Sequence, residues 1–232
     1  MDFKKFKSHE RVQEPIISDS HHHHLVLRHI NAWISDVVPR YISGVLLDFG
    51  CGGRQYEQIL SPFITKYIGA DVIESKGVKV DIIINPDKQL ELPDESIDSI
   101  LSTQVLEHVF DFNFYLRECS RLLKKNGVLA ISLPMHWRHH EKPHDFWRFT
   151  QFSIIRLLEM HGFKIENIDR AGGVYSLLGQ IFLDHVSEKN EYYKNFFDSS
   201  IVSMINQMCI HLDNKYPDDD ETIVWMIIAK KY

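Results

Sequence analysis

The chain has 232 residues, a length that fits one domain built around one core. Its composition is 44% hydrophobic and 25% charged, which is typical of a globular protein and excludes a disordered chain. The formal net charge of −6 does not supply the positive field of a nucleic-acid-binding protein, so we expect a small-molecule partner and no nucleic acid.

Membrane and disulfide signals are both missing from the sequence. No apolar run approaches the roughly 18 residues that span a bilayer, and no apolar signal segment follows Met1 to Lys5, so we predict a cytoplasmic protein without a membrane span. Cys51, Cys119 and Cys209 are far apart and form no CxxC pair, which favours free thiols over a disulfide framework or a zinc knuckle.

Residues 1–43 are predicted to form a polar tail followed by a helix from about Leu25, where apolar residues begin to recur at helical spacing. His21 to His24 lie at the start of this helix. A histidine run can bind a metal ion, but at a polar helix start it is more often a solvated segment, so we assign it no role.

From Gly44 onward, short apolar runs alternate with helical stretches, which indicates a parallel sheet with helices on both faces. A helix is predicted over residues 112–125, with Asn126-Gly127 as its stop signal. Residues 44–134 would form a cofactor-binding core. The strands predicted in it are residues 45–47, 67–70, 80–84, 97–101 and 128–133.

Residues 135–232 are predicted to contain an acceptor loop and the rest of the sheet. The expected elements are a helix over 151–161, a strand over 163–168, a helical block over 173–215 and a last strand over 222–229. The helical block can form a lid, pack on the sheet or make a homodimer contact. We therefore expect a single α/β domain, 1–232, with a doubly wound, largely parallel seven-stranded Rossmann-like sheet, an antiparallel last strand and a helical insertion before it.

A glycine-rich turn, Gly50 to Gly53, directly follows the first predicted strand. Such a turn lets the backbone approach a ligand, and the next helix directs N–H groups at an anionic group, although a plain strand-to-helix turn is the alternative. Gln55 stands where the NAD fingerprint requires glycine, so classical NAD binding is disfavoured. Asp71, about 20 residues further on, can accept hydrogen bonds from a ribose diol.

Five segments in this order carry a family resemblance. They are Leu47 to Gly53, Asp71, Leu92 to Asp98, Leu106 to Val109 and Leu122 to Gly127. Together they resemble the motifs of class I S-adenosylmethionine-dependent methyltransferases that act on small molecules, of the type 11-like group. The resemblance implies S-adenosylmethionine as the cofactor and methyl transfer as the reaction.

The resemblance also implies roles for individual residues. Asp48, Gly50 and Gly52 would line the methionine end of the cofactor, and Asp71 would bind the ribose hydroxyls. Gln104 would lie beside the sulfonium. Asn85 falls near the adenine position, where Asp87 is an alternative and where Asn85 can equally be a turn residue before Pro86.

Glu107 and His108 are predicted at the start of the helix after the fourth strand. They can cap that helix or orient a loop, and His108 can contact the substrate; we favour the structural roles. Amino-methylases of nucleic-acid bases carry an Asn/Asp-Pro-Pro-aromatic motif where this chain has Ser102 to Val105, which argues against DNA methylation.

The segment from Pro134 to Thr150 resembles a segment of methyltransferases from bacterial surface-polysaccharide and related small-molecule pathways. It follows the fifth strand, where acceptor loops lie in doubly wound sheets. Histidine suits a general base near neutral pH, and Arg148 can clamp a phosphate or carboxylate. The catalytic candidates are His139, His140 and His144, and the substrate-binding candidates are His136, Trp147 and Arg148.

Other interpretations of this segment stay open. Asp145 to Thr150 can be a buried aromatic turn with an internal Asp–Arg pair and Thr150 as a helix N-cap. The four histidines lack a recognised metal geometry, so no metal is predicted. The favoured function is methyl transfer to an oxygen or nitrogen of a small molecule, such as a sugar or sugar-linked phosphate of surface-polysaccharide synthesis. The alternative is a non-catalytic, cofactor-binding scaffold protein.

Overall fold

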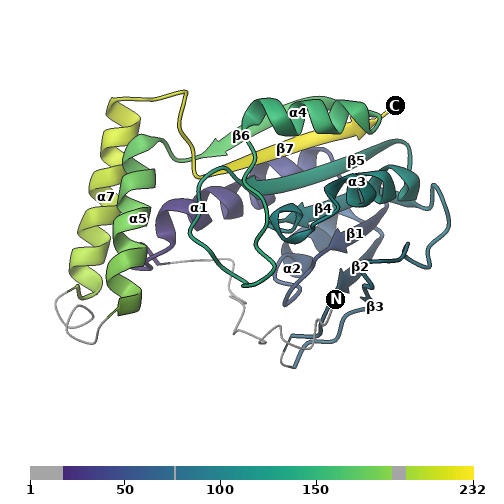
Figure 1. Cartoon of the computed structure of the whole chain (residues 1–232), viewed down its shortest axis with the longest axis horizontal. Coiled ribbons are helices and arrows are strands. Elements are labelled where there is room, and N and C mark those ends of the chain that lie inside the picture. The colour runs from purple at the N-terminus through teal and green to yellow at the C-terminus, as the bar shows by residue number, and fades with distance from the viewer. Residues whose placement is uncertain (1–17, 76, 190–196) are drawn as a thin grey trace.

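A seven-stranded sheet with the strand order β3-β2-β1-β4-β5-β7-β6 forms the centre of the structure (Figure 1). The computed structural model describes residues 18–75, 77–189 and 197–232, so most of the predicted N-terminal tail lies outside the described residues. The strands are β1 (Val45–Phe49), β2 (Lys66–Asp71), β3 (Ile82–Ile83), β4 (Ile97–Thr103), β5 (Leu123–Pro134), β6 (Phe163–Ala171) and β7 (Val224–Lys231).

The sheet is mixed. The strand β1 pairs in parallel with β2 and β4, and further parallel pairs join β2 to β3 and β4 to β5. The strand β7 runs antiparallel to both of its neighbours, β5 and β6, as predicted for the last strand. Because the strand order reverses at β1, the carboxyl ends of β1 and β4 form the switch point where doubly wound sheets bind ligands.

Helices cover both faces of the sheet. One face packs on α1 (His24–Ala32), the π turn that continues it (Trp33–Val37) and α2 (Glu57–Leu60). The other packs on α3 (Phe112–Leu122) and α4 (Gln151–Met160). Successive side chains of β1 point to opposite faces of the sheet, which explains the two layers. Leu46 packs in the layer with α1 and α2, and Leu47 in the layer with α3 and α4.

The predicted boundaries at the junction of α3 with β5 and those of β3 were wrong. The helix α3 ends at Leu122 instead of Lys125, because Leu123 already pairs with Ile97 of β4 and begins β5. Asn126, with φ +63°, lies where the register between β4 and β5 shifts, so the Asn-Gly pair makes a strand irregularity and not a helix stop. The strand β3, at the sheet edge, has two residues, whereas residues 80–84 were predicted.

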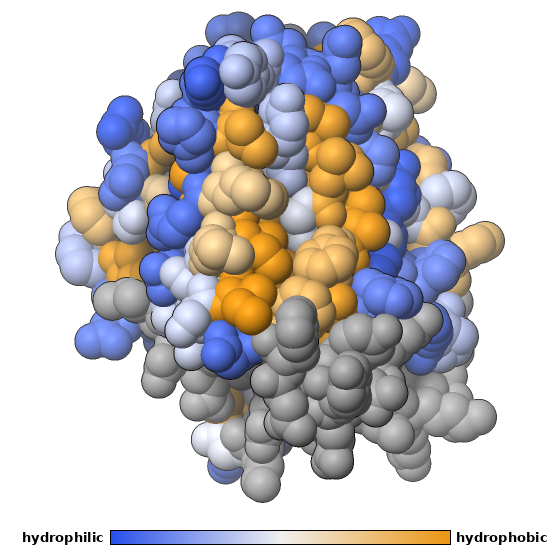
Figure 2. Space-filling view, turned by 90° about the vertical axis from the view of Figure 1, so that its left-hand side faces the viewer, coloured by the Kyte–Doolittle hydropathy of each residue, from blue (hydrophilic) through white to orange (hydrophobic). Residues whose placement is uncertain are grey.

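The predicted helical insertion consists of α5 (Val174–Lys189) and α7 (Ser199–Lys215), which lie side by side beyond one end of the sheet (Figure 1). They bury Leu183 and Cys209 together with Leu25 of α1. Their outer face is apolar and exposed, and it forms the orange stripe in Figure 2. The exposed apolar side chains on the two helices are Leu178, Ile181, Phe182, Met204 and Met208.

The histidine run at residues 21–24 is half-buried, so its interpretation as a solvated segment was wrong. His23 Nε2 lies 3.1 Å from Asp184 Oδ1 on α5. The side chains of Gln180 and Asn206 donate to the carbonyl oxygens of residues 22 and 21, at 3.0 and 3.1 Å. The run therefore fastens the start of α1 to both helices of the insertion.

Two further predictions concern the whole chain. The three cysteines are free, as predicted, and the structure buries them. No helix among the described residues is both long enough and apolar enough to cross a bilayer.

Candidate active site

The glycine-rich turn after β1 is held against the end of β2. The N–H groups of Gly50 and Cys51 donate to the carbonyl oxygen of Ala70 at 2.8 and 3.0 Å, and Gly52 N–H donates to Asp71 Oδ2 at 2.8 Å. Asp71 is therefore joined to the turn, and both lie at the carboxyl edge of the sheet. The sequence predicted these two features as parts of one site, and the structure brings them into contact.

Gly50 requires glycine on two grounds. Its φ of +94° lies in a region that L side chains rarely adopt. A Cβ atom on Gly50 would also lie 2.3 Å from Cγ2 of Val105, which follows β4. The turn thus passes so close to the end of β4 that no side chain fits between them.

Asp48, near the end of β1, is a buried acid with an unusual environment. Its side chain is 1% exposed and accepts a hydrogen bond from the hydroxyl of Tyr67 on β2. Burial, with a smaller contribution from the charge of Asp71, raises the pKa of Asp48 to about 7. Among the described residues no donor reaches its other oxygen, Oδ1, which is buried as well.

The other two predicted cofactor residues, Asn85 and Gln104, make hydrogen bonds of their own. Asn85 is exposed, and its Oδ1 accepts the N–H of Asp87 at 3.1 Å, which is the turn geometry that was open as an alternative. Gln104 has φ +55°, and its Nε2 donates to Ser132 Oγ at 3.2 Å. Gln104 thus fixes the end of β4 to β5 next to the glycine-rich turn.

The predicted acceptor loop, residues 135–150, closes on itself at the end of β5. Phe149 N–H donates to the carbonyl of Pro134, and the N–H groups of Phe146 and Trp147 donate to the carbonyl of Glu107 at 2.9 and 3.2 Å. Thr150 caps α4 by accepting the N–H of Ser153, as predicted. The loop is therefore anchored at its base and against the short turn after β4.

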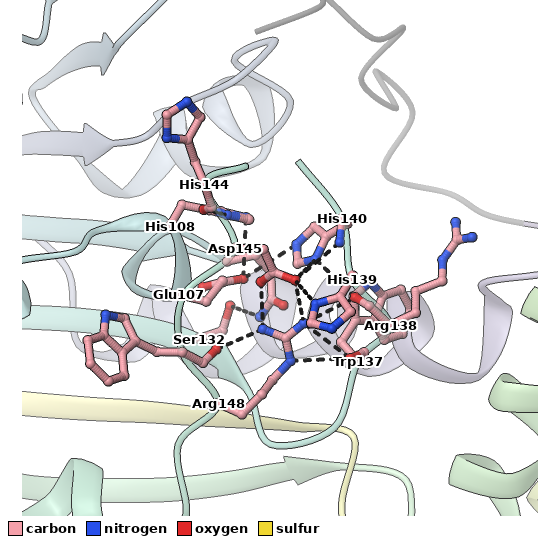
Figure 3. Close-up of polar contacts among 12 residues, drawn as sticks. Glu107, His108, Ser132, Trp137, Arg138, His139, His140, His144, Asp145 and Arg148 are labelled. Carbon is pink, nitrogen blue, oxygen red and sulfur yellow. Dashed lines mark hydrogen bonds and ion pairs between the residues drawn. The ribbon is translucent and has the colours of Figure 1, made fainter. Parts of the chain in front are cut away.

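An Asp145–Arg148 pair lies at the centre of the loop (Figure 3). Arg148 donates to both carboxylate oxygens of Asp145, at 2.6 and 2.9 Å, and also to the carbonyls of Trp137 and Arg138. Burial alone would raise the pKa of Asp145, but the bonds from Arg148 and the N–H of His140 hold it below its usual value. The internal pair is confirmed, and it occupies the guanidinium that was predicted to clamp an acceptor anion.

The predicted histidines do not converge on one point. His136 Nε2 lies 2.8 Å from Glu221, and the 80% exposed side chain of His139 lies 3.3 Å from Asp145. The ring of His144 points away from the Asp145–Arg148 pair (Figure 3). The ring of His140 faces the turn after β4, since its Nε2 lies 4.0 Å from Glu107 Oε1.

Trp147 packs in the wall of the loop. Its Nε1 donates to the carbonyl of Val109 at 3.1 Å, and its ring meets that of Phe112 edge to face at 5.2 Å. The aromatic residues of this segment therefore form the packed turn that was one of the two interpretations of the sequence.

Glu107 and His108 form a cluster with His140. Glu107 is 0% exposed, and neither of its carboxylate oxygens has a hydrogen-bond partner among the described residues. Burial raises its pKa to about 8. His108 Nε2 lies 3.9 Å from Glu107 Oε1, while His108 Nδ1 lies 2.8 Å from the carbonyl of His144. The backbone of Glu107 and the ring of His108 thus orient the loop, as favoured from the sequence.

Sequence reasoning missed the partners of several site residues. Tyr67 is a hydroxyl-bearing residue in an otherwise apolar strand, and that was the available signal for its bond to Asp48. Arg54 donates to Glu57 and Asp81, and so it ties the residue after the glycine-rich turn to the chain before β3. The full burial of Glu107 had no signal, since it arises from the loop that folds over it.

Comparisons with known proteins match the part of the chain that contains the glycine-rich turn and Asp71. A model described as a methyltransferase domain matches residues 47–131. A probable S-adenosylmethionine-dependent methyltransferase of Mycobacterium tuberculosis is 29% identical over 42% of this chain and 38% of its own length. A ubiquinone biosynthesis O-methyltransferase of Rhizobium rhizogenes is 28% identical over 66% of this chain and 65% of its own length. The chain thus spans less than two thirds of the length of these relatives.

Solved structures share the fold over most of the chain. A methyltransferase dependent on S-adenosylmethionine from Archaeoglobus fulgidus matches with a TM-score of 0.53 and 18% identity, over 88% of this chain and 91% of that one. The [4+2]-cyclase SpnF matches with a TM-score of 0.57 and 18% identity, over 89% and 82%. A fold shared with a cyclase does not by itself define a reaction.

Proposed function

We propose, from the premise that this chain belongs to the class I S-adenosylmethionine-dependent methyltransferases, that it transfers a methyl group to an oxygen or nitrogen of a small molecule. The single observation that carries the proposal is the contact between the glycine-rich turn and Asp71 at the carboxyl ends of β1 and β2, beside the switch point of the sheet. That contact combines a backbone open to close approach with a carboxylate suited to a ribose diol.

The residues at the carboxyl edge fit the cofactor. Asp48 offers a buried carboxylate oxygen without a donor, which suits the ammonium group at the methionine end. The turn at Gly50 leaves no room for a side chain, as a close ligand contact requires. Asp71 would bind the ribose hydroxyls, Gln104 would lie near the sulfonium, and Asn85 or Asp87 would approach the adenine.

When bound, S-adenosylmethionine supplies an already activated methyl group, so the chain's own contribution is mainly alignment of the acceptor. We assign acceptor binding to the loop of residues 135–150, with His136 and Trp147 among its walls. His139, His140 and His144 are our candidates for a group that takes the proton of an acceptor hydroxyl or ammonium. Burial lowers the pKa of His140, which keeps its ring neutral near pH 7.

Calorimetric titration with S-adenosylhomocysteine tests the cofactor site. We expect Asp71→Ala to weaken binding by about 1.5–3 kcal/mol, the range for hydrogen bonds to a charged group. Asp71→Asn is the matched control, because it retains an oxygen for the N–H of Gly52. Tight binding that survives both substitutions would contradict the assignment of Asp71.

Transfer of a labelled methyl group tests the reaction and separates it from the alternative of a non-catalytic scaffold. The acceptor pools to compare are sugars, sugar phosphates and phenolic quinone precursors. We propose the sugar class first, from the sequence of the acceptor loop, whereas the relatives named for ubiquinone biosynthesis favour the quinone precursors. No transfer to any pool, with normal S-adenosylhomocysteine binding, would support the scaffold.

We also propose that the exposed apolar stripe on α5 and α7 makes a homodimer contact. Two antiparallel helices that expose apolar side chains can pair with their copies to form a four-helix arrangement. Met204→Glu should reduce the mass measured by light scattering to that of one chain. A wild-type protein that is monomeric at high concentration would contradict the contact.

A further inference from the structure

We propose that Glu107, His108 and His140 bind a divalent transition-metal ion, with Zn²⁺ as the best match. One ligand atom from each residue lies within 4.8 Å of the other two. The residues come from two segments, the turn after β4 and the acceptor loop, which the fold brings together (Figure 3). The histidine spacing in the loop did not predict this site, because two of its three ligands lie outside the loop.

The proton positions on the two rings favour a cation at this point. His108 Nδ1 lies 2.8 Å from the carbonyl of His144, and His140 Nδ1 lies 3.2 Å from the carbonyl of Arg138. Since a carbonyl only accepts, each ring carries its proton on Nδ1 in these contacts. Each Nε2 then presents a lone pair, and both face the carboxylate of Glu107. Such bonds from Nδ1 to backbone oxygens also orient histidine ligands in metal sites.

Without a cation, the lone pairs of the two rings face a buried carboxyl group that no hydrogen bond holds. Glu107 has no donor on either oxygen among the described residues, and its distances of 3.9 and 4.0 Å to the two rings are too long for hydrogen bonds. Burying this carboxyl group without a hydrogen-bond partner is costly, whereas a metal ion would bind all three groups at once.

The distances require only a small closure. Metal–nitrogen and metal–oxygen distances for Zn²⁺ are about 2.0–2.2 Å, so each ligand atom would move inward by less than about half an ångström. Two imidazoles and one carboxylate suit Zn²⁺ and its transition-metal neighbours, whereas Mg²⁺ and Ca²⁺ prefer sites made of oxygen. Three protein ligands also leave a coordination position open, as in catalytic zinc sites.

The open coordination position would accept an oxygen of the acceptor. This role rests on the proposed methyl transfer, whereas the existence of the metal site does not depend on it. A metal-bound hydroxyl has a lowered pKa, which would help the acceptor lose its proton. His140 would then be a ligand, and proton transfer would be left to His139 or His144.

Binding of Co²⁺ to the full chain after removal of metal with a chelator tests the site. We expect visible d–d absorption at one equivalent per chain, and displacement of Co²⁺ by Zn²⁺. Glu107→Gln, which keeps size and shape, should weaken Co²⁺ binding at least about 100-fold, as should His140→Ala. Titration with S-adenosylhomocysteine on the same samples reports whether each variant is folded and has its cofactor site.

Two control variants separate this site from other histidines. His139→Ala alters the most exposed histidine of the loop and should leave Co²⁺ affinity unchanged. His21→Ala combined with His22→Ala removes part of the histidine run and should also leave it unchanged. Absence of Co²⁺ and Zn²⁺ binding below millimolar concentration, or binding that survives Glu107→Gln but is lost in the histidine-run variant, would overturn the proposal. Neither result would affect the proposed methyl transfer, which S-adenosylhomocysteine binding and methyl labelling test separately.

Discussion

Arg148→Ala should destabilise the acceptor loop more than any exposed ion-pair substitution in the chain. The variant removes both hydrogen bonds to Asp145, whose side chain is only 3% exposed and cannot recover them from water. Removing one partner of a buried pair costs about 3–5 kcal/mol. Since Arg148 is itself 25% exposed, we place the expected cost at the lower end, about 3 kcal/mol. The carbonyls of Trp137 and Arg138 lose donors in the same step.

Urea unfolding and amide hydrogen exchange together measure this cost. Urea reports the global free energy of unfolding, and exchange at Phe146 and Trp147 reports local opening of the loop, because their N–H groups bond to the carbonyl of Glu107. Arg156→Ala is the matched control. Arg156 is 74% exposed and lies 3.6 Å from Glu159, so its loss should cost less than about 0.5 kcal/mol.

The pair also has a defined pH dependence. The folded-state pKa of Asp145 lies below its unfolded value, so the stabilisation is present above about pH 4 and is lost as the pH falls through the folded-state pKa. Combining Arg148→Ala with Asp145→Asn should recover part of the loss, because no buried charge remains. A cost for Arg148→Ala no larger than that for Arg156→Ala would refute this reasoning and would return Arg148 to acceptor binding.

Three further predictions concern the cofactor edge and the insertion. In calorimetry, Gly50→Ala should weaken S-adenosylhomocysteine binding at least about tenfold, because of the φ of +94° and the clash with Val105. The Gly50→Ala/Val105→Ala double variant should recover only the part of the affinity that the clash removes. Asp48 should lower the unfolding free energy by up to on the order of 4 kcal/mol as the pH rises from about 4 to 7, because its carboxyl ionises first in the unfolded chain. Asp48→Asn should remove this part of the slope in urea titrations and leave the part that comes from the buried Glu107. Asp213→Ala should cost about 2–3 kcal/mol in the same assay, because Asp213 accepts the N–H groups of Gly173, Tyr175 and Ser176 at the start of α5; a loss below 0.5 kcal/mol would contradict that reason.

The strands and the cofactor edge could be predicted because their signals are local. A buried parallel strand appears as an apolar run, and the glycine-rich turn requires particular residues at fixed positions, such as Gly50. Asp71 could be joined to that turn because parallel strands end at the same edge. The reversed direction of β7 could be predicted only from the family resemblance, since an apolar run does not encode direction.

The acceptor loop could not be predicted in the same way, because its contacts join residues far apart in the sequence. The carbonyl of Glu107 binds two N–H groups of the loop, and the burial of Glu107 follows from that closure. Whether Arg148 turns inward to Asp145 or outward to a ligand depends on a loop geometry that no periodic pattern describes. The sequence left both options open, and the carbonyls of Trp137 and Arg138 favour the inward one.

The strand order also has a consequence for how the chain folds as it is synthesised. The strand β6 pairs only with β7, and residues 172–223 with both insertion helices separate the two strands. A growing chain therefore completes β6 well before β7 leaves the ribosome, and β6 stays unpaired until then. The parallel half of the sheet, from β3 to β5, can assemble during that time. Ribosome-stalled chains ending before β7 should thus form the cofactor edge while β6 is still accessible to chaperones and proteases.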